Sequence, residues 1–193
     1  DETMIHESPP HYSNEGYSYA KRMLELQCRQ YNKLGCQFIC VTPVNLYGPY
    51  DNFNLKNSHM IPGLMHRFYL TKKSAGKYVA YGTGNPLRQF LYSEDFAEII
   101  LQILHNSTVT DGNIICCNDK EYSIKEIVNL LASVMSIKTT DIVWDTTKSD
   151  GCMKKTVSNN KLKSIVNCEF TDLKEGLLKT YRWFNQNFYK IRK

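Results

Sequence analysis

The 193 residues, 42% of them hydrophobic and 22% charged, have the composition of an ordinary globular protein. No apolar stretch approaches the roughly 20 residues that cross a bilayer, and the acidic residues 1–6 contain no apolar run, so we expect a cytoplasmic protein with neither membrane span nor signal peptide. Much of the net charge of +5 comes from residues 148–193, where a solvated helix face explains it more simply than a nucleic-acid surface.

The first predicted elements are a loop, a helix and a strand. Residues 1–12 are rich in loop formers, and from residue 14 to 34 apolar residues recur at helical spacing. A short β-type run over residues 37–42 is ended by Pro43. A long loop rich in Asn, Gly and Pro is then predicted over residues 44–58, and loops of that length usually have a function.

Beyond residue 58 the predicted helices and strands alternate, which indicates the α/β class. Ser123 and Glu126 form a capping box at the start of one helix, and Ser93 is expected to cap another. The expected helices are 60–70, 93–105, 123–135, 159–166 and 172–188, and the expected strands are 78–81, 89–92, 113–117 and 141–145.

The seven cysteines include no Cys-x-x-Cys pair. Cys40, Cys116 and Cys117 lie within apolar, strand-like runs. We therefore expect reduced, partly buried thiols, and no metal site, because no four ligands have a recognisable spacing.

A candidate catalytic pair lies in the first predicted helix. Tyr17 and Lys21 form a Tyr-x-x-x-Lys motif, whose spacing places both side chains on one helix face, one turn apart. A fixed ammonium group stabilises the phenolate form of a nearby tyrosine, which suits a proton donor. Alone the motif has low specificity, because an exposed lysine near a packed tyrosine is common.

The segments that follow resemble those of the GDP-L-fucose synthases, which are extended short-chain dehydrogenase/reductases. The resemblance runs along the whole chain. Its clearest segments are Pro43-Val44-Asn45-Leu46-Tyr47-Gly48-Pro49, Asp51-Asn52-Phe53-Asn54, Asn57-Ser58-His59-Met60-Ile61-Pro62, Gly82-Thr83-Gly84-Asn85-Pro86-Leu87-Arg88-Gln89-Phe90 and Lys148-Ser149-Asp150-Gly151.

The resemblance implies the C-terminal part of an NAD(P)-binding, Rossmann-like protein with a small α/β substrate-binding domain. Residues 1–58 would end the Rossmann-like domain, with the Tyr-x-x-x-Lys helix and the cofactor loop. Residues 59–193 would form mainly the substrate domain, with one or two elements returning to the Rossmann sheet. The family's glycine-rich pyrophosphate loop and its catalytic serine and cysteine have no match here. The chain is therefore expected to be a fragment with little or no reductase activity alone.

The resemblance also implies a reaction, the NADPH-dependent conversion of GDP-4-keto-6-deoxy-D-mannose to GDP-L-fucose. Epimerisation at C3 and C5 precedes reduction at C4. Tyr17 would give a proton to the C4 oxygen, and Lys21 would assist it and bind the nicotinamide ribose. His59 would act as acid and base in the epimerisation, since imidazole exchanges protons near neutral pH. The family's members are typically homodimers.

The resemblance assigns binding roles to further residues. Arginine suits a diphosphate because its planar fork donates two hydrogen bonds at once. Arg67 stands where some relatives have lysine, and Tyr81 where the family often has tryptophan. The implied NADP(H) contacts are Tyr17, Lys21, Pro43, Val44, Asn45, Leu46 and His59, and the implied substrate contacts are Arg67, Tyr81, Arg88 and Asp150.

Two other functions are compatible with these residues. One is a different nucleotide-sugar epimerase or reductase of the same fold, which would not need His59. The other is a GDP-sugar-binding chain without turnover, which is consistent with the unmatched pyrophosphate loop.

Overall fold

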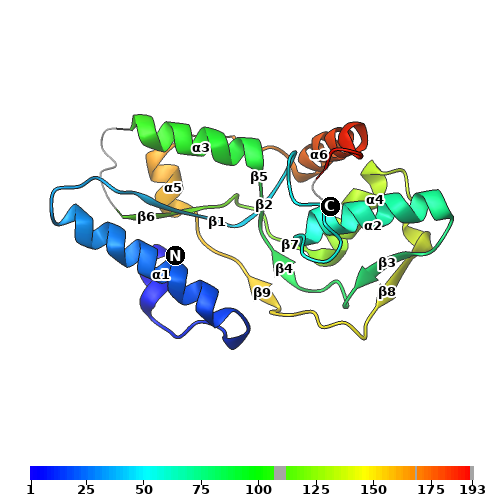
Figure 1. The fold of residues 1–193 in the computed structure, drawn as a ribbon, viewed down its shortest axis with the longest axis horizontal. Helices are drawn as coiled ribbons and strands as arrows, with labels where there is room; N and C mark the ends of the chain where they lie inside the picture. The colour runs from blue at the N-terminus through cyan, green and yellow to red at the C-terminus, as the bar shows by residue number, and fades with distance from the viewer. Residues whose placement is uncertain (107–111, 168, 192–193) are drawn as a thin grey trace.

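The structure, a computed structural model, describes residues 1–106, 112–167 and 169–191. It is elongated, and its elements form two groups along the long axis (Figure 1). The first group contains α1 (Glu15–Asn32), β1 (Cys40–Pro43), α3 (Ser93–His105), β6 (Asn113–Cys116) and α5 (Asn160–Ile165). The second contains α2 (Met60–Ser74), β3 (Tyr78–Tyr81), α4 (Ile124–Val134), β8 (Ile142–Asp145) and α6 (Leu173–Asn187).

Short parallel strand pairs connect these elements. β1 pairs with β6, β2 (Asn45–Tyr47) with β5 (Phe90–Tyr92), and β3 with β8. Because only Val44 separates β1 from β2, the chain changes its neighbouring strand at that residue. In parallel α/β sheets, ligands bind in the crevice that opens where neighbouring strands diverge. The β1–β2 junction is therefore a natural place for a site.

A small three-stranded sheet lies in the second group. β4 (Leu87–Arg88) is its central strand, with β7 (Tyr122–Ser123) antiparallel on one side and β9 (Lys154–Lys155) parallel on the other. This arrangement joins three segments that are distant in the sequence.

Each group has its own hydrophobic core. The core of the first group consists of Leu91, Ile99, Ile103, Ile114, Cys116, Leu162 and Val166. The core of the second is larger and aromatic, and its fully buried Phe53, Phe68 and Phe184 come from the long loop, α2 and α6. The centroids of the Phe53 and Phe184 rings are 4.8 Å apart, within the range of favourable ring pairs. Burying Phe53 anchors the loop that leads to His59.

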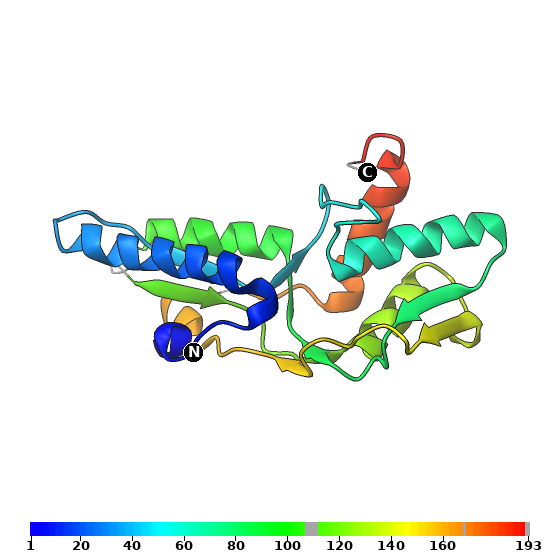
Figure 2. The ribbon, with the colours of Figure 1, turned by 60° about the horizontal axis from the view of Figure 1, so that its bottom comes forward.

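α1 is the least buried helix of the first group and lies on one side of it (Figure 2). Its one buried residue is Glu25, whose carboxylate contacts His6 at 2.6 Å and Arg29 at 2.8 Å. Met23 and Leu24, which the helical pattern places on an apolar face, are exposed. None of the described helices is long and apolar enough to cross a bilayer.

The α/β class and all the predicted helices are confirmed, with ends that differ by a few residues. Several details were wrong. The strand predicted over residues 37–42 is Cys40–Pro43 and includes Pro43, which pairs with Cys116, and β4, β7 and β9 were not predicted. Residues 1–12 contain the 3-10 helix Glu2–His6, because the Asp1 carboxylate caps it by accepting from the backbone N–H of Thr3. The predicted loop 44–58 contains β2, because Asn45–Tyr47 pairs with a distant strand. Ser93 is not a cap, since α3 begins at Ser93 and Tyr92 is its N-cap residue, which makes no side-chain capping bond.

The capping box of α4 leads to a prediction about stability. The Ser123 hydroxyl accepts from the backbone N–H of Glu126, whose carboxylate accepts from the backbone N–H of Ser123. We expect Ser123→Ala to lower the free energy of unfolding by about 0.5–2 kcal/mol, because it removes one half of this reciprocal cap. Ser133→Ala, at an exposed position of the same helix, is the control and should change little. Equal effects of the two variants in urea unfolding would contradict a capping role.

Candidate functional site

The main cavity has a volume of about 260 Å³ and collects six of the residues singled out from the sequence. They come from β2, the start of α2, β3, β4 and the segment after β8. These six residues are Asn45, Leu46, His59, Tyr81, Arg88 and Asp150. The rest of the lining is Met60, Ile61, Pro86, Phe90, Ile124 and Ser149.

Asn45 lies at the start of β2, beside the point where the chain changes its neighbouring strand. Its side-chain amide donates to the backbone carbonyl of Gln89 over 2.9 Å. This bond fixes the orientation of Asn45 and ties β2 to the segment that joins β4 and β5. Asn45 therefore lines the cavity in a fixed orientation.

His59 is the N-cap residue of α2, but its side chain does not cap the helix. Its backbone carbonyl accepts from the N–H of Gly63 over 3.0 Å, as expected for the first turn. The imidazole is exposed and lines the cavity. Burial raises the pKa of the Asp51 carboxyl group, whereas the Asn52 backbone N–H and, to a smaller extent, the charge of His59 lower it. His59 thus places an imidazole at the cavity with a carboxyl group nearby.

Arg88 brings a permanent positive charge to the cavity. It is half-buried in β4, and its guanidinium donates to the backbone carbonyl of Leu87 over 2.8 Å. In the sheet register Lys155 of β9 lies directly beside Arg88. Lys155 was not among the site residues predicted from the sequence. The lysine pair after the Lys-Ser-Asp-Gly segment is visible in the sequence, but the strand pairing that places it beside Arg88 is not.

Tyr81 links the cavity to Arg67. The Arg67 guanidinium lies over the Tyr81 ring, 4.2 Å from the ring centroid, which is a favourable cation–π distance. Arg67 is half-buried, and its Nε atom is buried without a hydrogen-bond partner among the described residues. Arg67 does not line the cavity, so its link to the site runs through Tyr81.

Asp150 is held by the turn after β3. Its carboxylate accepts from the backbone N–H of Thr83 over 2.7 Å and from the Thr83 hydroxyl over 2.6 Å. The hydroxyl first, and the backbone N–H second, lower the pKa of the Asp150 carboxyl group below its ordinary value. Gly82 is required here because its φ is +79° and a Cβ atom would lie 2.2 Å from the carboxylate.

Tyr17 and Lys21 lie on α1 and do not line the cavity. The expected one-turn arrangement is present, with the Lys21 Nζ atom 5.5 Å from the centroid of the Tyr17 ring. Tyr17 is exposed, whereas a chance occurrence of the motif with no catalytic role predicted a packed tyrosine. Pro43 and Val44 do not line the cavity either. They lie along β6, where Pro43 pairs with Cys116 and the Val44 N–H donates to the Cys116 carbonyl over 3.1 Å.

None of the six cysteines that the structure describes lines the cavity or forms a disulfide. Cys168 lies outside the described residues. Burial, followed by the nearby charges of Asp119 and Glu2, raises the pKa of Cys117 to about 11. A thiol with that pKa is protonated at neutral pH and is a poor nucleophile.

A second cavity, of about 150 Å³, lies at the N-terminal end of β7. It is lined by Asn118, Asp119, Lys120, Tyr122, Phe170, Thr171 and Asp172. It contains none of the residues singled out from the sequence.

The contact between Thr83 and Asp150 predicts a specific pH dependence. Because folding lowers the pKa of Asp150, this carboxylate stabilises the fold above its unfolded pKa of about 3.9, and the contribution disappears as the pH falls through the folded value. Thr83→Val removes the hydroxyl donor and keeps the backbone N–H. We expect the variant to be less stable than the parent at pH 7, and the difference to shrink at pH 2–3.

Urea unfolding at the two pH values measures this difference. Thr146→Val, a substitution at an exposed threonine near the same segment, is the control. A deficit of Thr83→Val that is equally large at pH 7 and at acidic pH would contradict the account of Asp150.

Comparisons with known proteins identify the family of the chain. A family model described as "NAD dependent epimerase/dehydratase family" matches residues 1–117. The chain is 44% identical to a GDP-L-fucose synthase of Dictyostelium discoideum, covering all of this chain and 61% of the relative. It is 39% identical to a probable GDP-L-fucose synthase of Drosophila melanogaster, covering all of this chain and 63% of that protein.

The fold of the chain is also similar to that of a solved structure. A GDP-L-fucose synthetase from Naegleria fowleri bound to NADP superposes with a TM-score of 0.94 at 38% identity, covering all of this chain and 62% of that one. The expected Rossmann-like α/β fold is therefore confirmed. The chain spans about three fifths of the length of the relatives it matches.

Proposed function

Since the chain belongs to the NAD-dependent epimerase/dehydratase family, we propose that it carries the substrate site and the epimerising group of a GDP-L-fucose synthase. The reaction is the NADPH-dependent conversion of GDP-4-keto-6-deoxy-D-mannose to GDP-L-fucose. One observation carries the proposal. A single cavity brings together His59, Arg88 and Asp150, which come from three distant segments and were each assigned to this reaction from the sequence.

Each of these groups has a separate task in the proposal. The protons on C3 and C5 lie next to the C4 carbonyl, so their removal gives an enolate and needs a positioned base and acid. His59 supplies an imidazole that makes no capping bond and faces the cavity. Arg88 binds the diphosphate, and Asp150, ionised at neutral pH, accepts hydrogen bonds from the substrate.

The cofactor residues fit only the nicotinamide end of NADPH, which supplies the hydride for C4. Tyr17 and Lys21 would bind the ribose and protonate the C4 oxygen, and residues 43–46 and His59 would border the ring. Gly82-x-Gly84 is unsuited to the pyrophosphate, because the Asp150 carboxylate already accepts the Thr83 N–H. For this reason we expect little or no reductase activity from these 193 residues alone, and NADPH oxidation at the rate of a full-length synthase would refute that expectation.

The domain division and the assembly are further parts of the proposal. The two separate cores support a division into two domains, in which Phe53 already packs in the second core. The elements beyond residue 58 that return to the Rossmann-like domain would be three, α3, β6 and α5, rather than one or two. The exposed apolar residues of α1 suit a helix at a homodimer interface in the cytoplasm. If light scattering gives the mass of a monomer for a chain that turns over the substrate, the proposed homodimer is contradicted.

Titration with GDP tests the substrate class without requiring the cofactor. We expect calorimetry to detect saturable binding of GDP, and binding of the keto sugar nucleotide to displace it. Heats no larger than those of dilution would refute the proposed function. The second candidate function is a GDP-sugar-binding protein without turnover, which is consistent with the unmatched pyrophosphate loop. A chain that binds GDP but catalyses no deuterium exchange at C3 and C5 would support this candidate.

A further inference from the structure

Gln89 is a buried residue next to Arg88 that does not line the cavity and for which the sequence predicted no role of its own. Its side chain is only 4% exposed. It lies between β4, which carries Arg88, and β5, which pairs with the strand of Asn45. A carboxamide buried this deeply costs free energy unless all its polar atoms are paired.

The Gln89 carboxamide binds backbone groups through both its oxygen and its nitrogen, and it also hydrogen-bonds the Cys117 side chain. Its oxygen accepts from the N–H of Val157 over 2.8 Å. Its nitrogen donates to the carbonyl of Val157 over 3.1 Å and to the carbonyl of Asn118 over 3.0 Å. One acceptor bond and two donor bonds use the two N–H groups and the oxygen of a glutamine side chain.

The side-chain bonds from Gln89 to Val157 extend the contact between β4 and β9 beyond the last residue pair of the two strands. Leu87 pairs with Lys154 and Arg88 with Lys155, and the Gln89 side chain then binds both backbone groups of Val157 as a neighbouring strand would. A register shift between the two strands would break both side-chain bonds to Val157. The carboxamide therefore fixes which residue of β9 lies beside Arg88.

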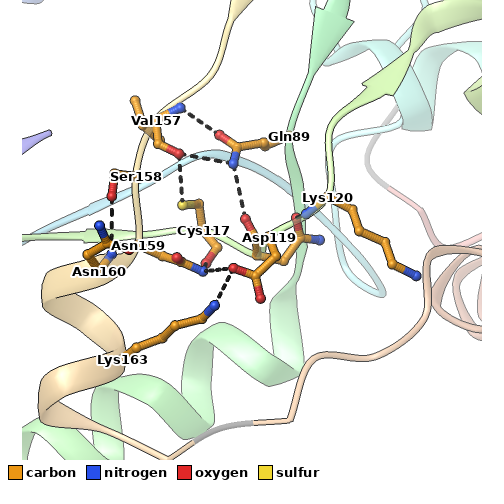
Figure 3. Close-up of polar contacts among 10 residues, drawn as sticks. Gln89, Cys117, Asp119, Lys120, Val157, Ser158, Asn159, Asn160 and Lys163 are labelled. Carbon is orange, nitrogen blue, oxygen red and sulfur yellow. Dashed lines mark hydrogen bonds and ion pairs between the residues drawn. The ribbon is translucent and has the colours of Figure 1, made fainter.

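The two segments that Gln89 binds, around Asn118 and Val157, are also hydrogen-bonded to each other. Figure 3 shows Gln89, Val157 and the loop of Cys117 and Asp119 joined by hydrogen bonds to the segment that enters α5. The Asn159 amide donates to the Cys117 carbonyl over 3.2 Å and to the Asp119 carboxylate over 2.9 Å. Lys163 forms an ion pair with the same carboxylate. We call Gln89, Asn118, Asp119, Val157, Asn159 and Lys163 the carboxamide clamp.

The backbone around Gln89 connects the clamp to the opposite wall of the cavity. The Gln89 carbonyl accepts from the Asn45 amide over 2.9 Å, and the Phe90 carbonyl accepts from the Asn118 amide over 2.7 Å. Arg88 is thus placed relative to Asn45 on one side and to β9 on the other. An apolar residue at position 89 would keep the backbone carbonyl that binds Asn45 but would lose the side-chain bonds that place Arg88 relative to β9.

We propose that Gln89 is a positioning residue for the nucleotide-sugar site, which holds the Arg88 guanidinium and the basic strand β9 in the arrangement that receives a diphosphate. The proposal rests on the proposed function. It assigns to Gln89 no contact with the substrate. Its effect on GDP binding should therefore act through Arg88.

A double-mutant cycle tests the proposal. Gln89→Met keeps the volume of the side chain and removes its three hydrogen bonds to backbone groups. We expect it to weaken GDP binding about tenfold in calorimetry, and less than twofold when Arg88 is already alanine, because coupled residues are not additive. Gln186→Met, at an exposed position on α6, is the control and should leave the affinity unchanged.

Three outcomes are informative. Unchanged affinity in Gln89→Met, or the same loss in both backgrounds, would overturn the positioning role, the second because it indicates a general disturbance of the fold. If Gln89→Met does not fold, Gln89→Asn replaces it in the cycle, since it keeps a carboxamide that is one methylene too short to reach all three partners. Failure of the parent chain to bind GDP would instead refute the proposed function, so the two failures are distinguishable.

Discussion

His59→Gln is expected to lower the catalysed exchange of solvent deuterium into C3 and C5 of GDP-4-keto-6-deoxymannose by about 10²- to 10⁴-fold, the usual contribution of a general acid or base. Glutamine keeps polarity and similar volume but does not exchange protons near neutral pH. The effect should be confined to chemistry, because the His59 side chain makes no capping bond to α2. GDP affinity and the melting temperature should therefore stay close to those of the parent chain.

Proton NMR of the substrate in deuterated buffer measures this exchange before any hydride transfer. His105→Gln is the matched control, since His105 lies at the end of α3 and does not line the cavity. If exchange is as fast in His59→Gln as in His105→Gln, the residue is not the epimerising group. The chain would then resemble the sugar epimerases of the same fold that need no histidine at this position.

Arg88→Ala is expected to weaken GDP binding by about 10- to 100-fold, because hydrogen bonds to charged groups contribute about 1.5–3 kcal/mol. The guanidinium is half-buried and held by the Leu87 carbonyl, so little side-chain freedom is lost when it binds a phosphate. Arg88→Lys should recover only part of the loss, since an ammonium group cannot donate in the planar, bidentate manner.

Calorimetric titration with GDP measures this effect. Arg182→Ala, at an exposed position on α6, removes the same charge far from the cavity lining and is the control. Equal affinities of Arg88→Ala and Arg182→Ala would mean that any weakening reflects net charge, and the diphosphate would have to bind elsewhere.

Local signals in the sequence predicted most elements of the fold. The α4 capping box, the apolar periodicity of α6 and the apolar run of β6 each lie within one segment, so they can be read without tertiary information. The short strands β2, β4, β7 and β9 were missed because two or three residues carry no periodic pattern. They exist only through pairing with distant partners.

The residues of the candidate site also differ in whether the local sequence predicts their arrangement. Tyr17 and Lys21 follow from helical spacing alone, and the structure places them on one face of α1. The gathering of His59, Arg88 and Asp150 around one cavity depends on strand pairing and was expected only from the family resemblance. Lys155 and Gln89 were missed for the same reason. Their roles arise from the β4–β9 register, which connects segments more than 60 residues apart.

Hydrogen–deuterium exchange of the backbone, measured with and without saturating GDP, tests most directly the claim that this cavity is the nucleotide-sugar site. We expect slower exchange in peptides that cover residues 81–90 and 149–157, and unchanged exchange in α1. Protection confined to residues 118–122 and 170–172, which line the second cavity, or protection only in α1, would contradict the account.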